Sequence, residues 1–200
     1  MREILPDIFT WPWFSDPHGY NFNGHFIRHS GGNLCVDPVA PSEEDLEELA
    51  RQGVASILIT NRNHGRSANA IRARTGARTA IHAADAPHAR KEGTLVDDEL
   101  ELGRKTGPFV VIGAPGKSPG EVVLHWPERK LLLVGDAVVG HPPGRCKLLP
   151  DKVVDNPVLL RESVRRLLAL DFETLLVGDG EPIIKSAREP LRELVASFPE

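Results

Sequence analysis

The chain has 200 residues, of which 40% are hydrophobic, and this is enough apolar material for the core of one domain. Its formal net charge is −4, with lysine and arginine scattered among aspartate and glutamate, so no basic surface for nucleic acid is expected. No segment approaches the roughly 20 apolar residues that span a bilayer, and the first residues lack the apolar run of a signal peptide. We therefore expect one domain over residues 1–200 of a cytoplasmic protein, without a nucleic-acid or membrane partner.

Several short elements are expected in the first half of the chain, because glycine and proline occur often between apolar stretches. A helix should begin after Ser42, which can cap it, since acidic residues follow in the first turn and apolar residues recur at helical spacing. The other elements expected here are two strands within residues 24–36, strands at 54–59 and 78–81, and a helix at 67–74 that Gly76 closes.

The second half is richer in strands. The elements expected there are strands at 109–112, 122–125 and 131–134 with a hairpin turn at 127–130, a helix at 158–170, a strand at 174–177 and a C-terminal helix at 184–196. Strands that alternate with helices, followed by a hairpin-rich middle, indicate mixed sheets with helices on the outside. In such folds the loops at the ends of buried strands usually carry the chemistry.

One of these loops invites a nucleotide-binding interpretation. Gly116, Lys117 and Ser118 match the end of a P-loop, but Val111 stands where that motif has its first glycine. The residues after Gly120 look like a strand, whereas a P-loop must open a helix whose N-terminal amides bind phosphate. A P-loop nucleotide binder is therefore the least favoured of the three functions considered.

Four polar loops, each following an apolar strand, carry a stronger resemblance. They are Asn61–Arg66, Pro115–Gly120, Gly135–Ala137 and Gly178–Gly180, and they come after a first hairpin that ends at Asp37. In this order and spacing they resemble the motifs of the metallo-β-lactamase superfamily, and within it the glyoxalase II-like hydrolases, over nearly the whole chain. The resemblance implies an α/β (α+β) fold of the αββα sandwich type, in which helices flank two mixed β-sheets.

The resemblance also implies that most metal ligands of the superfamily are replaced. At the matching positions, where the family has five histidines and an aspartate, this chain has Asn61, Asn63, Gly65, Arg66, Lys117 and Asp179. Only Asp136, which would bridge two metals in the family, is of the family's residue type. His64 lies one position away from a ligand position of the family. We call the following seven residues the vestigial pocket: Asn61, Asn63, His64, Arg66, Lys117, Asp136 and Asp179.

The chemistry of these side chains argues against zinc. Zinc prefers imidazole, thiolate or carboxylate donors, whereas an asparagine amide is a weak neutral donor. Arginine keeps its proton and brings a charge without a lone pair. We therefore expect no metal or other cofactor. Instead, Arg66 and Lys117 are predicted to pair with Asp136 and Asp179, because a buried carboxylate without a partner is costly. No catalytic residue is assigned, and the two cations suggest a small anionic ligand.

An alternative interpretation is that the pocket retains a single metal ion. His64, Asp136 and Asp179 together provide three donors that suit one divalent cation, and such a site would make the chain an unorthodox single-metal hydrolase of the ester or thioester type. A lone loop histidine is, however, more often a hydrogen-bonded structural residue. The sequence leaves open whether the protein is an enzyme.

The N-terminal segment is rich in aromatic residues, since residues 9–26 hold seven of the eleven in the chain. These side chains are expected to line a ligand pocket, to form a homodimer contact, or to cap the core beneath a long loop. The two cysteines, Cys35 and Cys146, lie in or beside apolar stretches and are expected to be buried free thiols.

Overall fold

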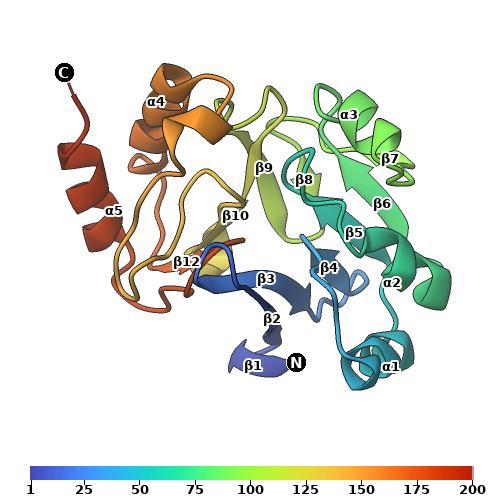
Figure 1. Ribbon diagram of the computed structural model, residues 1–200. Helices are drawn as coiled ribbons and strands as arrows, with labels where there is room; N and C mark the ends of the chain where they lie inside the picture. The colour runs from blue at the N-terminus through green and yellow to red at the C-terminus, as the bar shows by residue number, and fades with distance from the viewer. Residues whose placement is uncertain (200) are drawn as a thin grey trace.

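Two mixed β-sheets face each other in the computed structural model, which describes residues 1–199, and helices cover their outer faces (Figure 1). The first sheet has the order β1-β2-β3-β4-β5-β6-β7. Its strands are β1 (Arg2–Leu5), β2 (Ile8–Ser15), β3 (Tyr20–Ile27), β4 (Leu34–Val36), β5 (Ser56–Ile59), β6 (Arg78–Ile81) and β7 (Asp98–Glu99). Neighbours from β1 to β4 are antiparallel, and those from β4 to β7 are parallel.

The second sheet has the order β12-β11-β10-β9-β8. Its strands are β8 (Lys105–Thr106), β9 (Phe109–Gly113), β10 (Val122–Trp126), β11 (Leu131–Leu133) and β12 (Thr174–Leu176). A 3-10 turn over Pro127–Arg129 joins β10 to β11 in an antiparallel hairpin, as the sequence predicts, and β12 adds to β11 in parallel.

The helices are divided between the outer faces of the two sheets. In Figure 1, α4 (Pro157–Leu167) and α5 (Arg188–Ala196) lie on the left. The helices α1 (Glu43–Gln52), α2 (Ala68–Thr75) and α3 (Ala86–Lys91) lie on the right. Ser42 caps α1, and Gly76 ends α2 in the left-handed conformation, as predicted. The αββα sandwich expected from the sequence is confirmed.

Strand β5 explains how the layers hold together. Because successive side chains of a strand point to opposite faces, Ile57 and Ile59 pack in the apolar cluster beneath the helices α1 to α3. Leu58 points the other way, into the cluster between the two sheets. A third cluster lies between the second sheet and the helices α4 and α5. Each strand that is buried on both faces therefore reads as a continuous apolar run.

The sequence prediction is wrong at both C-terminal helices. Helix α4 ends at Leu167 rather than residue 170, and α5 begins at Arg188 rather than residue 184. Ile183 exchanges two backbone hydrogen bonds with Leu175 of β12, and Ser186 adopts a positive φ of 53°, so this segment extends the sheet before the helix begins. The prediction also omits β1, β2, the first half of β3, α3, β7 and β8.

The thiol prediction is correct in part. Both cysteines are free, but only Cys35 is buried, whereas Cys146 is partly exposed. Over residues 1–199, no helix combines the length and apolarity that a membrane crossing requires.

Candidate functional site

His64 lies at the centre of the site, in the loop that follows β5, and it is completely buried. Its Nδ1 atom is 3.0 Å from Oδ2 of Asp37, and its Nε2 atom is 3.0 Å from Oδ1 of Asp136. Asp37 also accepts hydrogen bonds from the backbone N–H and the hydroxyl of Thr60, at 2.8 and 2.6 Å. The histidine ring is thus held on both sides by carboxylates.

The protonation of this ring follows from its partners. An ionised carboxylate only accepts hydrogen bonds, so Nε2 must carry hydrogen to bond Asp136. The hydrogen bond of Nδ1 is to the Thr60 hydroxyl, at 3.3 Å, and because that hydroxyl already donates to Asp37, Nδ1 must carry hydrogen as well. Burial and the charge of Arg66 act to lower the pKa of His64, but Asp136 and Asp37 outweigh them and raise its pKa to about 10. The geometry and the electrostatics therefore agree on an imidazolium cation, which has no free lone pair.

Lys117, in the loop that follows β9, reaches the same carboxylate as His64. Its Nζ atom is 3.5 Å from Oδ2 of Asp136 and donates a hydrogen bond to Oδ1 of Asn63 at 2.7 Å. The lysine side chain is only 9% exposed, so most of its charge is withdrawn from water. Burial acts to raise the pKa of Asp136, but His64, Lys117 and Arg66 outweigh this and hold it well below its usual range.

Arg66 forms the second predicted ion pair, with Asp179. One of its terminal nitrogens is 3.6 Å from Asp179 Oδ1, and its guanidinium lies 4.7 Å from the centre of the Phe22 ring. At that distance there is no hydrogen bond, and Asp179 Oδ1 has no hydrogen-bond partner in the described part of the chain. Burial and the neighbouring charge of Asp136 raise the pKa of Asp179 to about 6.

The structure also places Asn61 in the site, but behind the ion pairs. Its side-chain oxygen accepts from the backbone N–H of Asn63 at 2.9 Å, and its amide nitrogen lies 3.4 Å from Oε1 of Glu121. The seven residues of the vestigial pocket therefore gather in one place. Asn61 is buried, whereas Asn63 is exposed, at the rim of the pocket.

Glu121 is a site residue that sequence reasoning missed. It is 1% exposed, and its Oε1 atom accepts a 2.8 Å hydrogen bond from the backbone N–H of Asp136. The Oε2 atom has no partner among residues 1–199. Burial and the charge of Asp136 raise the pKa of Glu121 well above its usual value. The available signal was a charged residue immediately before the largely apolar strand β10.

Asp85 is the second missed residue, and it joins two of the loops. Its carboxylate accepts hydrogen bonds from the backbone N–H of Arg62 at 2.8 Å, from the Ser118 hydroxyl at 2.5 Å and from the backbone N–H of Gly120 at 2.8 Å. Asp85 is fully buried. It thereby fixes the loop of Asn63 relative to the loop of Lys117, from outside the pocket.

Two cavities open on either side of Arg66. One, of about 340 Å³, is mostly apolar and is lined by Trp13, Phe22, Val39, Ala40, Arg66 and Ser67. The other, of about 250 Å³, is polar and is lined by Arg62, Asn63, Gly65, Arg66, Asn69, Glu92, Gly93 and Thr94. Trp13 and Phe22 thus line a cavity beside the site, as one of the sequence alternatives has it. Trp11 and Phe26 instead belong to the core.

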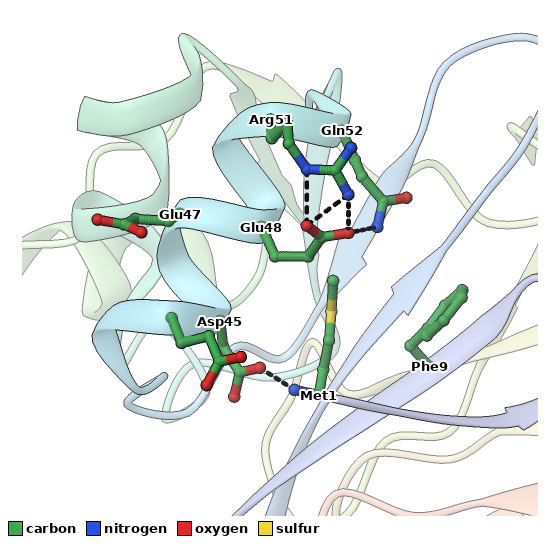
Figure 2. Close-up of a pocket in the computed structure, with 8 residues that line it drawn as sticks. Met1, Phe9, Asp45, Glu47, Glu48, Arg51 and Gln52 are labelled. Atoms are coloured by element: carbon green, nitrogen blue, oxygen red, sulfur yellow. Dashed lines mark hydrogen bonds and ion pairs between the residues drawn. The ribbon is translucent and has the colours of Figure 1, made fainter.

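A different cavity, of about 380 Å³, lies over helix α1, away from the strand-end loops (Figure 2). Its walls are largely acidic, and two of its four acids, Asp45 and Glu48, are paired within the protein. Glu48 bonds Arg51 and Gln52, and the amino group of Met1 bonds Asp45, as the dashed lines in Figure 2 show. Hydrogen bonding to Arg51 lowers the pKa of Glu48. This cavity holds no set of side chains aimed at a common point.

Comparison with known proteins agrees with this architecture. The chain is 29% identical to a hydroxyacylglutathione hydrolase of Cereibacter sphaeroides over 194 residues, which cover 91% of this chain and 69% of that protein. A metallo-beta-lactamase from Pontibacter korlensis superposes with a TM-score of 0.79 at 16% identity, covering 98% of both chains. A metallo-beta-lactamase family protein from Thermus thermophilus gives 0.72 at 20% identity, covering 97% of this chain and 80% of that one. Residues 2–198 match the family described as the metallo-beta-lactamase superfamily, and the chain belongs to that superfamily.

Proposed function

We propose that this hydrolase-like fold works without a pair of zinc ions and binds a small anionic ligand in the vestigial pocket. The observation that carries the proposal is the position of His64 between Asp37 and Asp136, with both ring nitrogens 3.0 Å from carboxylate oxygens. A doubly protonated ring cannot ligate a metal, and its charge repels one.

The other positions that resemble metal-ligand positions do not fit a zinc pair either. The side-chain oxygens of Asn61 and Asn63 already accept hydrogen bonds from within the protein. Lys117 and Arg66 place two cations against Asp136 and Asp179, where metals would need the carboxylates to be free. These contacts support a cluster in which protein cations take over the charge balance that metals provide in a metalloenzyme.

The anionic ligand is supported by Arg66. Its side chain is 22% exposed, it lines both cavities beside the site, and its single carboxylate neighbour lies beyond hydrogen-bond distance. A guanidinium with unused donors that faces a cavity is a suitable partner for a carboxylate or a phosphate.

Metal analysis tests the proposal. Protein purified without a chelator should contain well under one equivalent of transition metal, and its thermal midpoint should not change when a chelator is added. It should not hydrolyse hydroxyacylglutathione, the class of compound for which the Cereibacter relative is named, before or after soaking with zinc, manganese or iron. Stoichiometric metal together with hydrolysis would overturn the proposal.

A second candidate is a single-metal hydrolase. Its support is that one ligand atom from each of His64, Asp136 and Asp179 lies within 4.8 Å of the other two. The Oδ1 atom of Asp179, which has no hydrogen-bond partner among residues 1–199, would be one such ligand atom. A divalent metal bound there would lower the pKa of a bound water and so supply a nucleophile. This candidate requires His64 to lose a proton, and it predicts about one equivalent of metal that is lost in Asp136→Ala.

A further inference from the structure

Strand β3 carries three polar side chains at alternating positions, Asn21, Asn23 and His25. Asn23 is 3% exposed and His25 is completely buried. Because alternate residues of a strand share a face, they lie on the same face as Ile27, which packs in the cluster between the two sheets. Polar side chains that are buried in such a place need hydrogen-bond partners, and the partners indicate what the side chains do.

The partners of Asn23 lie in the loop that follows β12 and carries Asp179. The side-chain nitrogen of Asn23 donates to the backbone oxygens of Val177 at 3.2 Å and of Gly180 at 2.7 Å. Its backbone N–H donates to the oxygen of Gly178 at 2.7 Å. A reversed amide would set its oxygen against two carbonyl oxygens, so these partners settle the orientation of the side chain. Asn23 therefore holds the backbone on both sides of Asp179.

His25 and Asn21 add two contacts to the same loop. The Nε2 atom of His25 lies 3.1 Å from the backbone oxygen of Val177, and because a carbonyl oxygen only accepts, Nε2 carries the hydrogen of this bond. The backbone oxygen of Asn21 accepts from the N–H of Gly180 at 2.8 Å. One strand of the first sheet thus fixes the course of a loop that belongs to the second sheet.

The loop held in this way sets Asp179 beside Phe22 and Arg66. Asp179 forms an antiparallel bridge with Phe22, and the Arg66 guanidinium lies 4.7 Å from the centre of the Phe22 ring and 3.6 Å from Oδ1 of Asp179. Arg66 forms no other ion pair within residues 1–199, so these two neighbours determine where its charge lies.

We propose that Asn23 and His25 are positioning residues, which fix Arg66 by holding the loop of Asp179. The inference rests on the proposed function, since Arg66 is the residue to which that function assigns the anionic ligand. Neither positioning residue lines a cavity beside Arg66, so each acts only through the loop. The alternation of aromatic and polar residues in β3 then has a reason, because Phe22 contacts Arg66 and the polar side chains of the other face hold its partner.

The test follows the NMR signal of the Arg66 Nε–H group in the full chain, without added ligand or metal, and Arg66→Lys identifies that signal by its loss. Because an aromatic ring shifts protons above its face upfield, Phe22→Leu should move the signal downfield. We expect Asn23→Ala to move it in the same direction by most of that displacement. The matched control is Asn21→Ala, since the Asn21 side chain bonds only Glu181, at 3.4 Å, and its backbone contact survives the substitution; the signal should not move.

Two variants of His25 decide the matter if Asn23→Ala does not fold. His25→Gln keeps a donor for the oxygen of Val177, whereas His25→Leu fills a similar space without one. The Arg66 signal should move in His25→Leu and stay near its parent position in His25→Gln. An unmoved signal in folded His25→Leu, or equal shifts in the two His25 variants or in Asn21→Ala, would overturn the positioning role. None of these results depends on anion or metal binding, so the metal analysis tests the proposed function separately.

Discussion

The Nε2 atom of His64, in a loop of the first sheet, lies 3.0 Å from Oδ1 of Asp136, in a loop of the second sheet. Neither residue is appreciably exposed, since the two side chains have 0% and 7% of their surface accessible. In this environment a charged hydrogen bond is strong when both partners are ionised, and the loss of either charge is costly. Most of the expected behaviour of the protein follows from this contact and its neighbours.

Stability should depend on the charge of His64. The pKa of about 10 in the folded protein lies above the ordinary value of 6.5, so the stabilisation is complete below about pH 6.5 and is lost as the pH rises toward 10. We expect the free energy of unfolding of the metal-free protein, measured with urea, to fall over this range. His64→Gln should flatten the profile; an equal slope in both proteins would show that other groups cause it.

The pair of Lys117 and Asp136 should matter for stability. Lys117→Met leaves Asp136 with one cation fewer in a buried position, and we expect a loss of about 3 kcal/mol in the free energy of unfolding. Lys105→Met is the matched control, because Lys105 lies 3.5 Å from Glu128, the same separation, but both side chains are more than 60% exposed. The control should change stability by less than about 1 kcal/mol. Similar losses in the two variants would contradict the importance of burial.

The two aspartates of the site should respond oppositely to neutralisation. Burial and Asp136 raise the pKa of Asp179 to about 6, so its charge is unfavourable in the folded state at pH 8. Asp179→Asn should therefore stabilise the metal-free protein at pH 8 by about 1 kcal/mol, whereas Asp136→Asn should destabilise it by about 3 kcal/mol. The comparison is made by urea denaturation at pH 8. If Asp179→Asn destabilises the protein and also removes a bound metal, the single-metal candidate is favoured.

Gly116 is expected to be essential for the loop that carries Lys117. It has a φ of 144°, and a Cβ atom there would lie 2.4 Å from the backbone nitrogen and Cα of Leu160 in helix α4. Gly116→Ala should therefore cost about 3 kcal/mol or more, since the loop and the helix must separate. Gly144→Ala is the control, because Gly144 also has a positive φ, 78°, but nothing lies near its Cβ position; it should cost about 1 kcal/mol. Equal effects would show that backbone strain alone accounts for both.

The fold could be predicted from the sequence because its strongest signals are local. Ser42 and Gly76 mark helix ends by their capping chemistry, and the apolar runs mark the buried strands. The start of α5 could not be predicted in this way. Residues 183–184 pair with β12 through tertiary hydrogen bonds, and this pairing overrides a helical apolar spacing.

The sequence predicts most of the residues that form the candidate site, but fewer of the contacts that hold them in place. The resemblance of the strand-end loops to the superfamily's motifs identifies Arg66, Lys117, Asp136 and Asp179, and the structure pairs them as predicted. The sequence does not reveal the buried acid Glu121 or Asp85, which joins two loops. Their roles depend on burial against loops that are distant in sequence. A single buried acid in an apolar context is visible in a sequence, but its partner is not.

The position of His64 has a consequence for how the protein unfolds. Its ring forms an ion pair with Asp37, after β4 of the first sheet, and bonds Asp136, after β11 of the second, so the charge of one side chain links the two halves of the sandwich. The apolar cluster between the sheets links them as well. Unfolding should accordingly be a single cooperative event while the ring is charged. Single-tryptophan variants that keep Trp11 in β2 or Trp126 in β10 should report the same urea midpoint at pH 6, and separation of these midpoints above pH 10 would mark the loss of that link.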